Sequence, residues 1–345
     1  MQLLITGGAG FIGSHLVHHM LREHSDYRVR VLDALTYAGS RDNLKEVEGD
    51  QRFEFVHGDI LDIAQHPDVL RGVDAVLHLA AETHNDRAIL ECGGFVLTDV
   101  LGTQRMLQAS LEAGVKRFLH VSTCEVYGAI ETGRFREDDP FHPNQPYSAS
   151  KAGGDLIART YHRTYGMDVV IARPVNNLGP RQFPEKLIPL MISRAMHDQP
   201  LPVYGDGRQV REWIHVDDCC RALDTILHRG VAGEAYNVGA NIERENLDVI
   251  RTILRLLGKP ETLVAHVADR PGHDRRYALD VTKIHTLGWR AEIGFDDALG
   301  QTVQWYVAHR DWVDGILARS EEHRAFLRKW YESRLDGDLG NSQYV

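Results

Sequence analysis

Tyr147 and Lys151 are spaced so that a phenol and an ammonium group can act together. They stand four positions apart in the segment Tyr-Ser-Ala-Ser-Lys, and residues four apart lie on one face of a helix. A neighbouring cation favours the phenolate, so we expect a lowered pKa for Tyr147. The pair then predicts a general base that removes a proton from a substrate hydroxyl group.

A hydroxyl, a thiol and a carboxylate follow one another at Thr123, Cys124 and Glu125. They come directly after the β-rich run 117–122, which is typical of a strand. In an open α/β sheet, ligands bind outside the carboxyl ends of the strands. We therefore expect these three side chains to lie at that edge, where they would meet Tyr147 over a cofactor.

A glycine-rich loop occupies residues 7–13, Gly-Gly-Ala-Gly-Phe-Ile-Gly, between a predicted strand and a predicted helix. Small residues let the backbone approach a pyrophosphate, which then lies on the helix N-terminus. Asp33 ends the second predicted strand, where a carboxylate accepts a hydrogen bond from a ribose 2′-hydroxyl and repels a 2′-phosphate. The sequence therefore predicts NAD, and not NADP, as the cofactor.

Two further strand ends carry residues suited to contact the same cofactor. Asp59 and Ile60 follow the third predicted strand, and Leu79, Ala80 and Ala81 follow the fourth. Strand ends at one edge of a parallel sheet lie close together. We expect the first pair to flank the adenine and the second group to flank the nicotinamide ribose.

The elements that must position these residues alternate between β-rich and helical runs, which indicates parallel strands joined by crossover helices. The predicted strands are 3–6, 27–32, 53–57, 75–79, 117–122 and 168–172, and the predicted helices are 12–23, 98–113, 148–165, 217–227 and 247–257. We predict an α/β fold, a Rossmann doubly wound parallel sheet with a smaller C-terminal substrate lobe. Residues 1–177, with a returning segment at about 212–240, would bind NAD, and residues 178–335 would mainly bind the substrate.

The composition of the chain argues against several classes of binding partner. The 345 residues carry a formal net charge of −10, which argues against nucleic acid or an anionic membrane as a partner because both need a basic surface. There is no apolar run of membrane length and no signal-peptide pattern. The four cysteines form no CxxC pair and the 19 histidines are scattered, so we expect a reduced, cytoplasmic protein without a metal site.

Longer motifs extend over nearly the whole chain. They are ITGGAGFIGS (5–14), LTYAG (35–39), HLAAE (78–82), DR (86–87), YSASK (147–151), NN (176–177), FPEKLIPL (183–190), REWIHVD (211–217) and DRPGHDRRYA (269–278). With these motifs the chain resembles the extended short-chain dehydrogenase/reductase superfamily and, within it, the dTDP-glucose 4,6-dehydratase family. The last three blocks are long and specific to that family.

The resemblance implies roles for particular residues. Thr123, Cys124, Glu125, Tyr147 and Lys151 would be catalytic, with Thr123 at the sugar 4-hydroxyl and Glu125 as the base at C5. The cofactor would contact Gly7, Gly10, Phe11, Ile12, Gly13, Asp33, Leu35, Thr36, Asp59, Ile60, Leu79, Ala80, Ala81, Thr98, Tyr147, Lys151 and Asn177. A nucleoside-diphosphate hexose would contact Thr83, Asn176, Lys186, Leu187, Pro202, Tyr204, Arg211, Asn246, Arg270 and His273.

Arginines concentrated in these blocks independently suit a diphosphate, which binds best to bidentate donors. A solvated charged face is the alternative for Arg270, Arg275 and Arg276. The resemblance also suggests a homodimer formed through the helices at 98–113 and 148–165.

The implied reaction is redox-neutral overall. Oxidation at C4 makes the C5 proton acidic, Glu125 removes it, the C6 hydroxyl leaves as water, and hydride returns to the sugar. The family outcome is a 4-keto-6-deoxy sugar.

Cys124 departs from the family, which has aspartate in Ser-Thr-Asp-Glu-Val-Tyr-Gly. A thiol with a pKa of ~8.5, against ~3.9 for a carboxyl, is the weaker acid by about 6 kcal/mol. The nucleotide-sugar 5,6-dehydratases carry this cysteine, so hydride return to C4 and a 5,6-alkene product form an alternative to 4,6-dehydration. A C4 epimerase and a non-catalytic NAD-binding protein are further alternatives, but neither needs Glu125 beside Thr123.

Four smaller departures accompany Cys124. Asn85 replaces an apolar residue, Asp99 replaces asparagine, and Leu178 and Arg181 replace residues such as tyrosine. Because Leu178 and Arg181 depart from the family pattern, the sequence does not identify the nucleobase or the hexose of the substrate.

Overall fold

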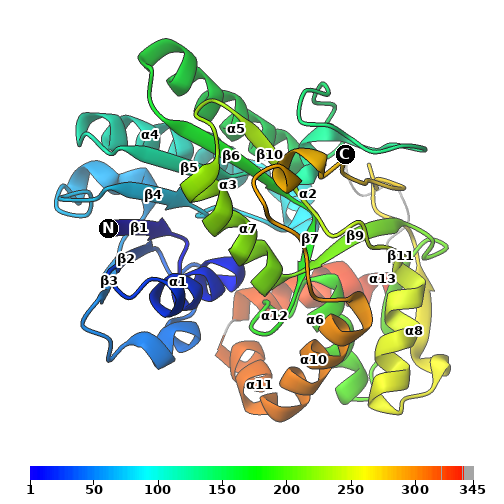
Figure 1. The fold of residues 1–345 in the computed structure, drawn as a ribbon. Coiled ribbons are helices and arrows are strands. Elements are labelled where there is room, and N and C mark those ends of the chain that lie inside the picture. The colour runs from blue at the N-terminus through cyan, green and yellow to red at the C-terminus, as the bar shows by residue number, and fades with distance from the viewer. Residues whose placement is uncertain (320, 336, 338–345) are drawn as a thin grey trace.

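The computed structural model describes residues 1–319, 321–335 and 337. Its centre is a seven-stranded sheet with the order β10-β6-β5-β4-β1-β2-β3 (Figure 1), and every pairing in it is parallel. Six of these strands follow the order 3-2-1-4-5-6 of a doubly wound dinucleotide-binding sheet. The strands are β1 (Gln2–Thr6), β2 (Arg28–Asp33), β3 (Phe53–His57), β4 (Ala75–His78), β5 (Arg117–Val121), β6 (Val169–Pro174) and β10 (Ala235–Val238).

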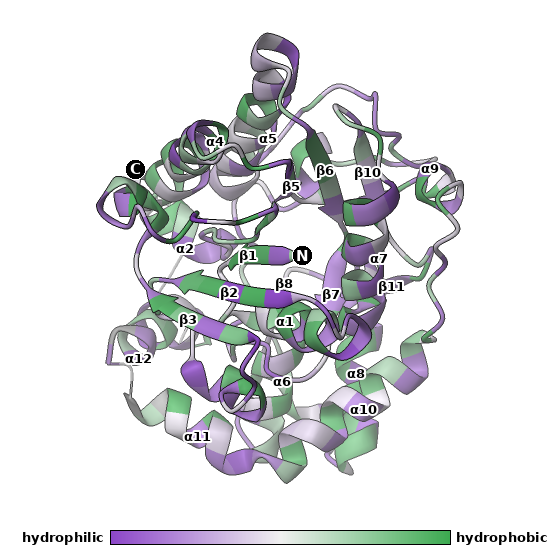
Figure 2. Cartoon of the chain, turned by 60° about the vertical axis from the view of Figure 1, so that its left-hand side comes forward, coloured by the Kyte–Doolittle hydropathy of each residue, from purple (hydrophilic) through white to green (hydrophobic). Residues whose placement is uncertain are grey.

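Apolar side chains fill both faces of this sheet, as expected for a parallel sheet covered by helices. Figure 2 shows both hydrophobic and hydrophilic residues in β2, and its apolar residues Val29, Val31 and Leu32 are buried. Successive residues of β1 point to opposite faces: Leu3 and Ile5 belong to one core, and Leu4 belongs to another. The sheet is therefore the middle layer of three.

The helices of the two outer layers come from different parts of the chain. On one face lie α1 (Phe11–Glu23) and α7 (Val216–Arg229), which pack against each other. On the other face lie α4 (Thr103–Glu112) and α5 (Pro146–Tyr165). The helix preceding α4 consists of α3 (Gly93–Phe95) and a π-helical segment, η3 (Val96–Gly102).

A separate core lies beside the sheet, among segments that mostly follow residue 177. Its helices are α6 (Leu187–Met196), α8 (Asn246–Leu257), α10 (Phe295–Ala308) and α11 (Arg310–Arg319), followed by α12 (Glu321–Leu327), η6 (Arg328–Glu332) and α13 (Ser333–Leu335). Two small sheets accompany them: β11 (Glu243–Glu245), β9 (Val210–His215) and β7 (Asn176–Leu178) form one, and β12 (Val264–Val267) and β8 (Leu201–Tyr204) form the other.

Shorter elements connect these layers. They are η1 (Arg41–Val47), η2 (Ile60–Gln65), α2 (Asn85–Leu90), η4 (Cys124–Tyr127), η5 (Glu261–Leu263) and α9 (Thr282–His285). No helix among the described residues has the length and apolar character needed to cross a membrane.

The predicted fold class is confirmed, and the predicted strands agree with the structure to within two residues at each end. The helix predicted at 98–113 differs more, because helical structure begins at Gly93 and passes through η3 before α4. Within the segment 212–240, β10 pairs with β6 of the large sheet.

Candidate active site

A cavity of about 410 Å³ lies where the strands of the large sheet end. Residues that directly follow six strands line it: Gly7, Ala34, Gly58, Leu79, Ser122 and Val175. The opposite wall comes from the second core, including α6 and β8. The cavity therefore occupies the position at which open α/β sheets bind ligands.

The glycine-rich loop forms one end of this cavity. Its backbone packs so closely at two glycines that a side chain there would clash with neighbouring backbone atoms. Gly7 has a φ of +70°, and a Cβ on it would lie 2.7 Å from the Ala80 backbone nitrogen. A Cβ on Gly13 would lie 2.1 Å from the Gly7 carbonyl oxygen. The loop therefore brings bare backbone to the N-terminus of α1, which is the arrangement that a dinucleotide pyrophosphate requires.

Asp33 is fixed beside this loop by two backbone groups. Its Oδ2 accepts from the Ala9 N–H and its Oδ1 from the Leu35 N–H, both at 2.8 Å. Burial raises the pKa of Asp33, and the two hydrogen bonds oppose that shift. Each carboxylate oxygen retains a lone pair for a ribose hydroxyl, so the loop and Asp33 together fit NAD.

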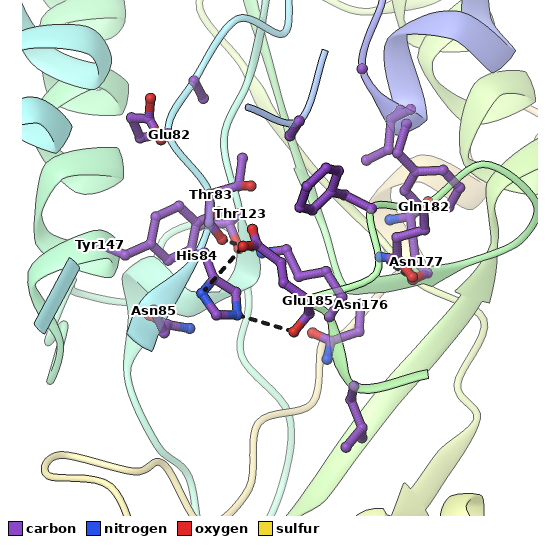
Figure 3. Close-up of a pocket in the computed structure, with 18 of the residues that line it drawn as sticks. Glu82, Thr83, His84, Asn85, Thr123, Tyr147, Asn176, Asn177, Gln182 and Glu185 are labelled. Atoms are coloured by element: carbon purple, nitrogen blue, oxygen red, sulfur yellow. Dashed lines mark hydrogen bonds and ion pairs between the residues drawn. The ribbon is translucent and has the colours of Figure 1, made fainter. Parts of the chain in front are cut away.

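Thr123, Glu125, Tyr147 and Lys151 line the cavity together. Thr123 caps η4 by accepting from the Glu125 N–H at 3.2 Å. Glu125 is held by its side chain as well, because its Oε2 accepts from Asn85 Nδ2 at 2.9 Å. Figure 3 shows Thr123, Tyr147 and Asn85 grouped on one side of the pocket.

The electrostatic setting of Tyr147 differs from the sequence-based expectation. Its pKa lies well above the usual value, because burial and the charges of Glu125 and Asp99 outweigh the hydrogen bond from Thr123. The Lys151 ammonium instead donates to the Val121 carbonyl oxygen at 2.8 Å. The predicted lowering of the Tyr147 pKa is therefore wrong for the protein alone, and the phenol is protonated at neutral pH.

Cys124 is the candidate catalytic residue that the structure does not bring to the cavity. Its side chain is 1% exposed and packs in the main core with Val126 and Tyr127. Burial, followed by the charges of Glu125 and Glu212, raises the pKa of the thiol well above its usual value. The thiol is thus a protonated neighbour of the reaction centre that does not line its wall.

The remaining predicted cofactor residues line the cavity, with one exception. Leu35 has a positive φ of 51° and contributes its backbone N–H to Asp33, so its role is to shape the loop. The residues that line the cavity are Gly7, Gly10, Phe11, Ile12, Gly13, Asp33, Thr36, Asp59, Ile60, Leu79, Ala80, Ala81, Thr98, Tyr147, Lys151 and Asn177.

All ten predicted substrate residues line the same cavity: Thr83, Asn176, Lys186, Leu187, Pro202, Tyr204, Arg211, Asn246, Arg270 and His273. Lys186 donates to the Thr83 carbonyl oxygen, and the Arg211 guanidinium lies 4.6 Å from the centre of the Tyr277 ring. Three cationic side chains, Lys186, Arg211 and Arg270, thus face one space. By contrast, Arg275 is paired with Asp206 and Arg276 with Glu243, away from the lining.

Sequence reasoning missed several residues of this wall. Asp86 pairs with Arg270 at 2.9 Å, and Glu185 pairs with Arg87 at 2.8 Å. Figure 3 shows Glu185 beside His84, whose ring nitrogen lies 3.2 Å from the Glu185 carbonyl oxygen. The motifs that contain these residues were visible in the sequence, but their partners more than 90 positions away were not.

A group of imidazoles lies outside the cavity, between the end of α1 and α7. Asp224 accepts from His19 at 2.8 Å, from His24 at 3.0 Å and from His228 at 2.9 Å. Among the described residues, His24, Asp224 and His228 are close enough together to hold a metal ion. The group shares no residue with the cavity lining.

Comparison with known proteins agrees with this geometry. The chain matches the GDP-mannose 4,6 dehydratase family over residues 4–302. It is 48% identical to a dTDP-glucose 4,6-dehydratase of Actinoplanes sp. over 318 residues, which cover 90% of this chain and 99% of the relative. The chain belongs to the dTDP-glucose 4,6-dehydratase family of extended short-chain dehydrogenases/reductases.

Two solved structures, one of a dehydratase and one of an epimerase, are similar to this dehydratase. The dTDP-glucose 4,6-dehydratase of Streptomyces venezuelae, crystallised with NAD, superposes with a TM-score of 0.90 at 51% identity, covering 92% of this chain and all of that one. The UDP-glucuronic acid 4-epimerase of Bacillus cereus, also crystallised with NAD, gives 0.85 at 30% identity, covering 90% of this chain and all of that one. The dehydratase is an NAD-dependent hydro-lyase, and NAD, when bound, accepts and returns the hydride.

Proposed function

We propose that this dehydratase converts a nucleoside-diphosphate hexose, with dTDP-glucose as the first candidate, into its 4-keto-6-deoxy product. The observation that carries this proposal is the presence of Glu125 in one cavity with Thr123, Tyr147 and Lys151. Epimerisation at C4 needs the hydroxyl chemistry of Tyr147 but not a second base. Dehydration needs a group that removes the C5 proton, and Glu125 is the carboxylate placed beside Tyr147.

Different residues of the chain carry out the individual proton transfers. Tyr147 must first lose its own proton, because its pKa is raised in the protein alone, and a positive charge bound beside it would favour the phenolate. The phenolate then receives the proton of the sugar 4-hydroxyl, with the Thr123 hydroxyl beside it. Glu125 takes the C5 proton and returns a proton to the C6 oxygen, which leaves as water. Because Cys124 does not line the cavity, Glu125 serves both steps.

The same placement of Cys124 favours a second candidate product, a 5,6-alkene. The buried thiol has a pKa well above its usual value, so it is a far weaker acid than the family aspartate. If C6 is not activated by such an acid, hydride returns to C4 and the double bond remains.

Product analysis in heavy water distinguishes these outcomes. We would incubate the NAD-loaded enzyme separately with dTDP-glucose, UDP-glucose and UDP-N-acetylglucosamine and follow each sugar by NMR. We expect a 4-keto-6-deoxy sugar with deuterium at C5 from at least one substrate. Vinyl signals at C6 would overturn 4,6-dehydration in favour of the alkene, and an inverted C4 would indicate an epimerase.

Glu125→Gln tests the base directly. We expect dehydration to fall by about 10²–10⁴-fold, the usual contribution of a general base, together with loss of deuterium incorporation at C5. Glu131→Gln, at an exposed glutamate, is the matched control and should retain full activity. Full turnover by Glu125→Gln would remove this residue from the mechanism.

Cys124→Asp tests the departure from the family. We expect the aspartate to change the rate or the ratio of the two products, because it restores the family's acid next to Glu125. If product and rate both stay the same, the cysteine does not determine the outcome.

We also propose which residues bind each ligand, that the protein is cytoplasmic, and that it forms a homodimer. Residues 1–177 with 212–240 would bind NAD, and 178–335 would mainly bind the sugar nucleotide, which agrees with the pairing of β10 with β6. Four cysteines without disulfides support a reduced cytoplasmic setting. A homodimer is supported by exposed apolar side chains on η3 and α5, namely Val96, Leu97, Leu101 and Leu156.

A further inference from the structure

The last described helices pack directly onto the substrate wall. Phe326, Trp330 and Tyr331 are buried, with exposures of 7%, 1% and 4%. The Phe326 ring lies 4.5 Å from the Arg87 guanidinium, and Tyr331 lines the cavity itself. This segment, α12 to α13 or Glu321–Leu335, lies beyond residue 302, the last residue that matches the GDP-mannose 4,6 dehydratase family description. We call it the C-terminal strap.

The strap is joined to the wall by a hydrogen-bond network centred on Asp86. The Tyr331 hydroxyl donates to Asp86 Oδ2 at 2.8 Å, and the Tyr204 hydroxyl donates to the same oxygen at 2.7 Å. Trp330 Nε1 in turn donates to the Tyr204 hydroxyl at 2.5 Å. Two strap residues therefore fix both the orientation of Tyr204 and one oxygen of Asp86.

The other oxygen of Asp86 holds a cation of the cavity. Asp86 Oδ1 accepts from Arg270 Nη1 at 2.9 Å, and both side chains are largely buried. Arg270 Nε is also buried and has no hydrogen-bond partner among the described residues. A buried guanidinium donor without a partner is costly, and an anionic ligand in the cavity would satisfy it.

We propose that the C-terminal strap is part of the nucleotide-sugar site and that Tyr331 is a positioning residue that aims Arg270 at the diphosphate through Asp86. This inference rests on the proposed substrate class. Without the Tyr331 hydroxyl, Asp86 loses one of its three donors and Arg270 loses a fixed partner. Substrate affinity should fall, whereas the proton transfers at Glu125 and Tyr147 should be unaffected.

Tyr331→Phe removes the hydroxyl and keeps the ring. We expect the Kd for dTDP, measured by calorimetry on the NAD-loaded enzyme, to rise about tenfold, the loss typical of one hydrogen bond to a charged group. The KM for the sugar nucleotide should rise by the same factor, with kcat changed less than twofold. Tyr236→Phe, which also removes a buried and hydrogen-bonded hydroxyl, is the matched control and should change neither constant.

A double-mutant cycle tests the route through Asp86. In the background Asp86→Asn, we expect Tyr331→Phe to weaken dTDP binding by less than twofold further, because the shared partner is already altered. Equal effects of Tyr331→Phe in both backgrounds would overturn the positioning role, and so would unchanged affinity in the single variant. Failure of the parent enzyme to bind dTDP, UDP or GDP would instead overturn the proposed substrate class and, with it, this inference.

Discussion

Tyr147 and Lys151 share their buried surroundings with a third ionisable side chain, Asp99. Its Oδ1 accepts from the Glu82 N–H at 2.9 Å, and its Oδ2 accepts from the Ser150 hydroxyl at 2.6 Å. Burial raises its pKa to about 6, even though the charge of Lys151 and both hydrogen bonds lower it. Asp99 therefore changes charge near neutral pH, close to the catalytic pair.

This raised pKa predicts a pH-dependent cost to stability. Because the folded value of about 6 exceeds the unfolded value of 3.8, the folded state binds the proton more tightly, and stability falls as the pH rises from about 4 to 6. In Asp99→Asn, the amide oxygen can still accept from the Glu82 N–H, and the amide NH2 can donate to the Ser150 oxygen in a bond of reversed direction, while the side chain carries no charge. We expect the free energy of unfolding of Asp99→Asn, relative to the parent, to increase by up to about 3 kcal/mol across that range.

Urea unfolding at a series of pH values measures this difference. Asp26→Asn, at an exposed aspartate, is the control for a general charge effect. A difference between Asp99→Asn and the parent that stays constant with pH, or that decreases as the pH rises, would contradict the assignment.

At the residue scale, the sequence predicted which side chains gather but not what their surroundings do to them. Motif and strand-end position placed Thr123, Glu125 and Tyr147 in one site. The pKa of Tyr147 depends on burial and on Asp99, which is distant in sequence. The spacing of Tyr147 and Lys151 alone therefore could not predict the direction of the pKa shift. The inward orientation of Cys124 depends on how η4 turns, and its position next to Glu125 does not reveal it.

At the scale of elements, the catalytic helix α5 is fastened to the sheet by a fully buried ion pair. Arg173 on β6 donates to both oxygens of Asp155 on α5, at 2.9 and 3.0 Å, and both side chains have no exposed surface. Arg173 also donates to the Tyr127 hydroxyl at 2.6 Å. This pair links the helix that carries Tyr147 to η4, which follows Thr123.

Breaking this pair should destabilise the whole fold. Asp155→Ala leaves a buried guanidinium without its counter-ion, a change that typically costs about 3–5 kcal/mol. Asp168→Ala removes the partner of Arg117 in a pair that is 22% and 32% exposed, so we expect a cost of about 1 kcal/mol or less. Chemical denaturation of both variants compares the two, and similar losses would contradict the importance given to burial.

Hydrophobic patterning predicted the strands from β1 to β6 to within two residues at each end, and the bounds predicted for β3 are those observed. Hydrophobic patterning predicted the helices less well where tertiary contacts determine the backbone conformation. The π-helical turn of η3 lies where Gly154 packs so closely that a Cβ on it would lie 2.5 Å from the Asp99 carbonyl oxygen. The helices of the C-terminal strap were not predicted. Their apolar residues pack against the substrate wall of the cavity, which exists only in the folded protein.

At the scale of the whole molecule, the proposed homodimer would cover an apolar surface on η3 and α5. Leu97 is 50% exposed and Leu156 is 51% exposed, and the two helices pack against each other, as the contact of Gly153 with Val100 shows. We expect the double variant Leu97→Glu, Leu156→Glu to be monomeric by light scattering after size exclusion.

Val231→Glu provides the matched control, because Val231 is 60% exposed outside these helices. It should leave the oligomeric state unchanged. A parent protein that is already monomeric, or a double variant that stays dimeric, would contradict this interface.

The bond between Asp86 and Tyr331 joins residues 245 positions apart. During synthesis, the strands and helices that contain the glycine loop, Glu125 and Tyr147 all leave the ribosome well before Tyr331 does. Because contacts of long sequence separation form late and close slowly, the catalytic groups would be assembled while the substrate wall is still open. A chain that ends before Tyr331 would therefore keep the sheet and its catalytic side chains but lack this part of the substrate wall.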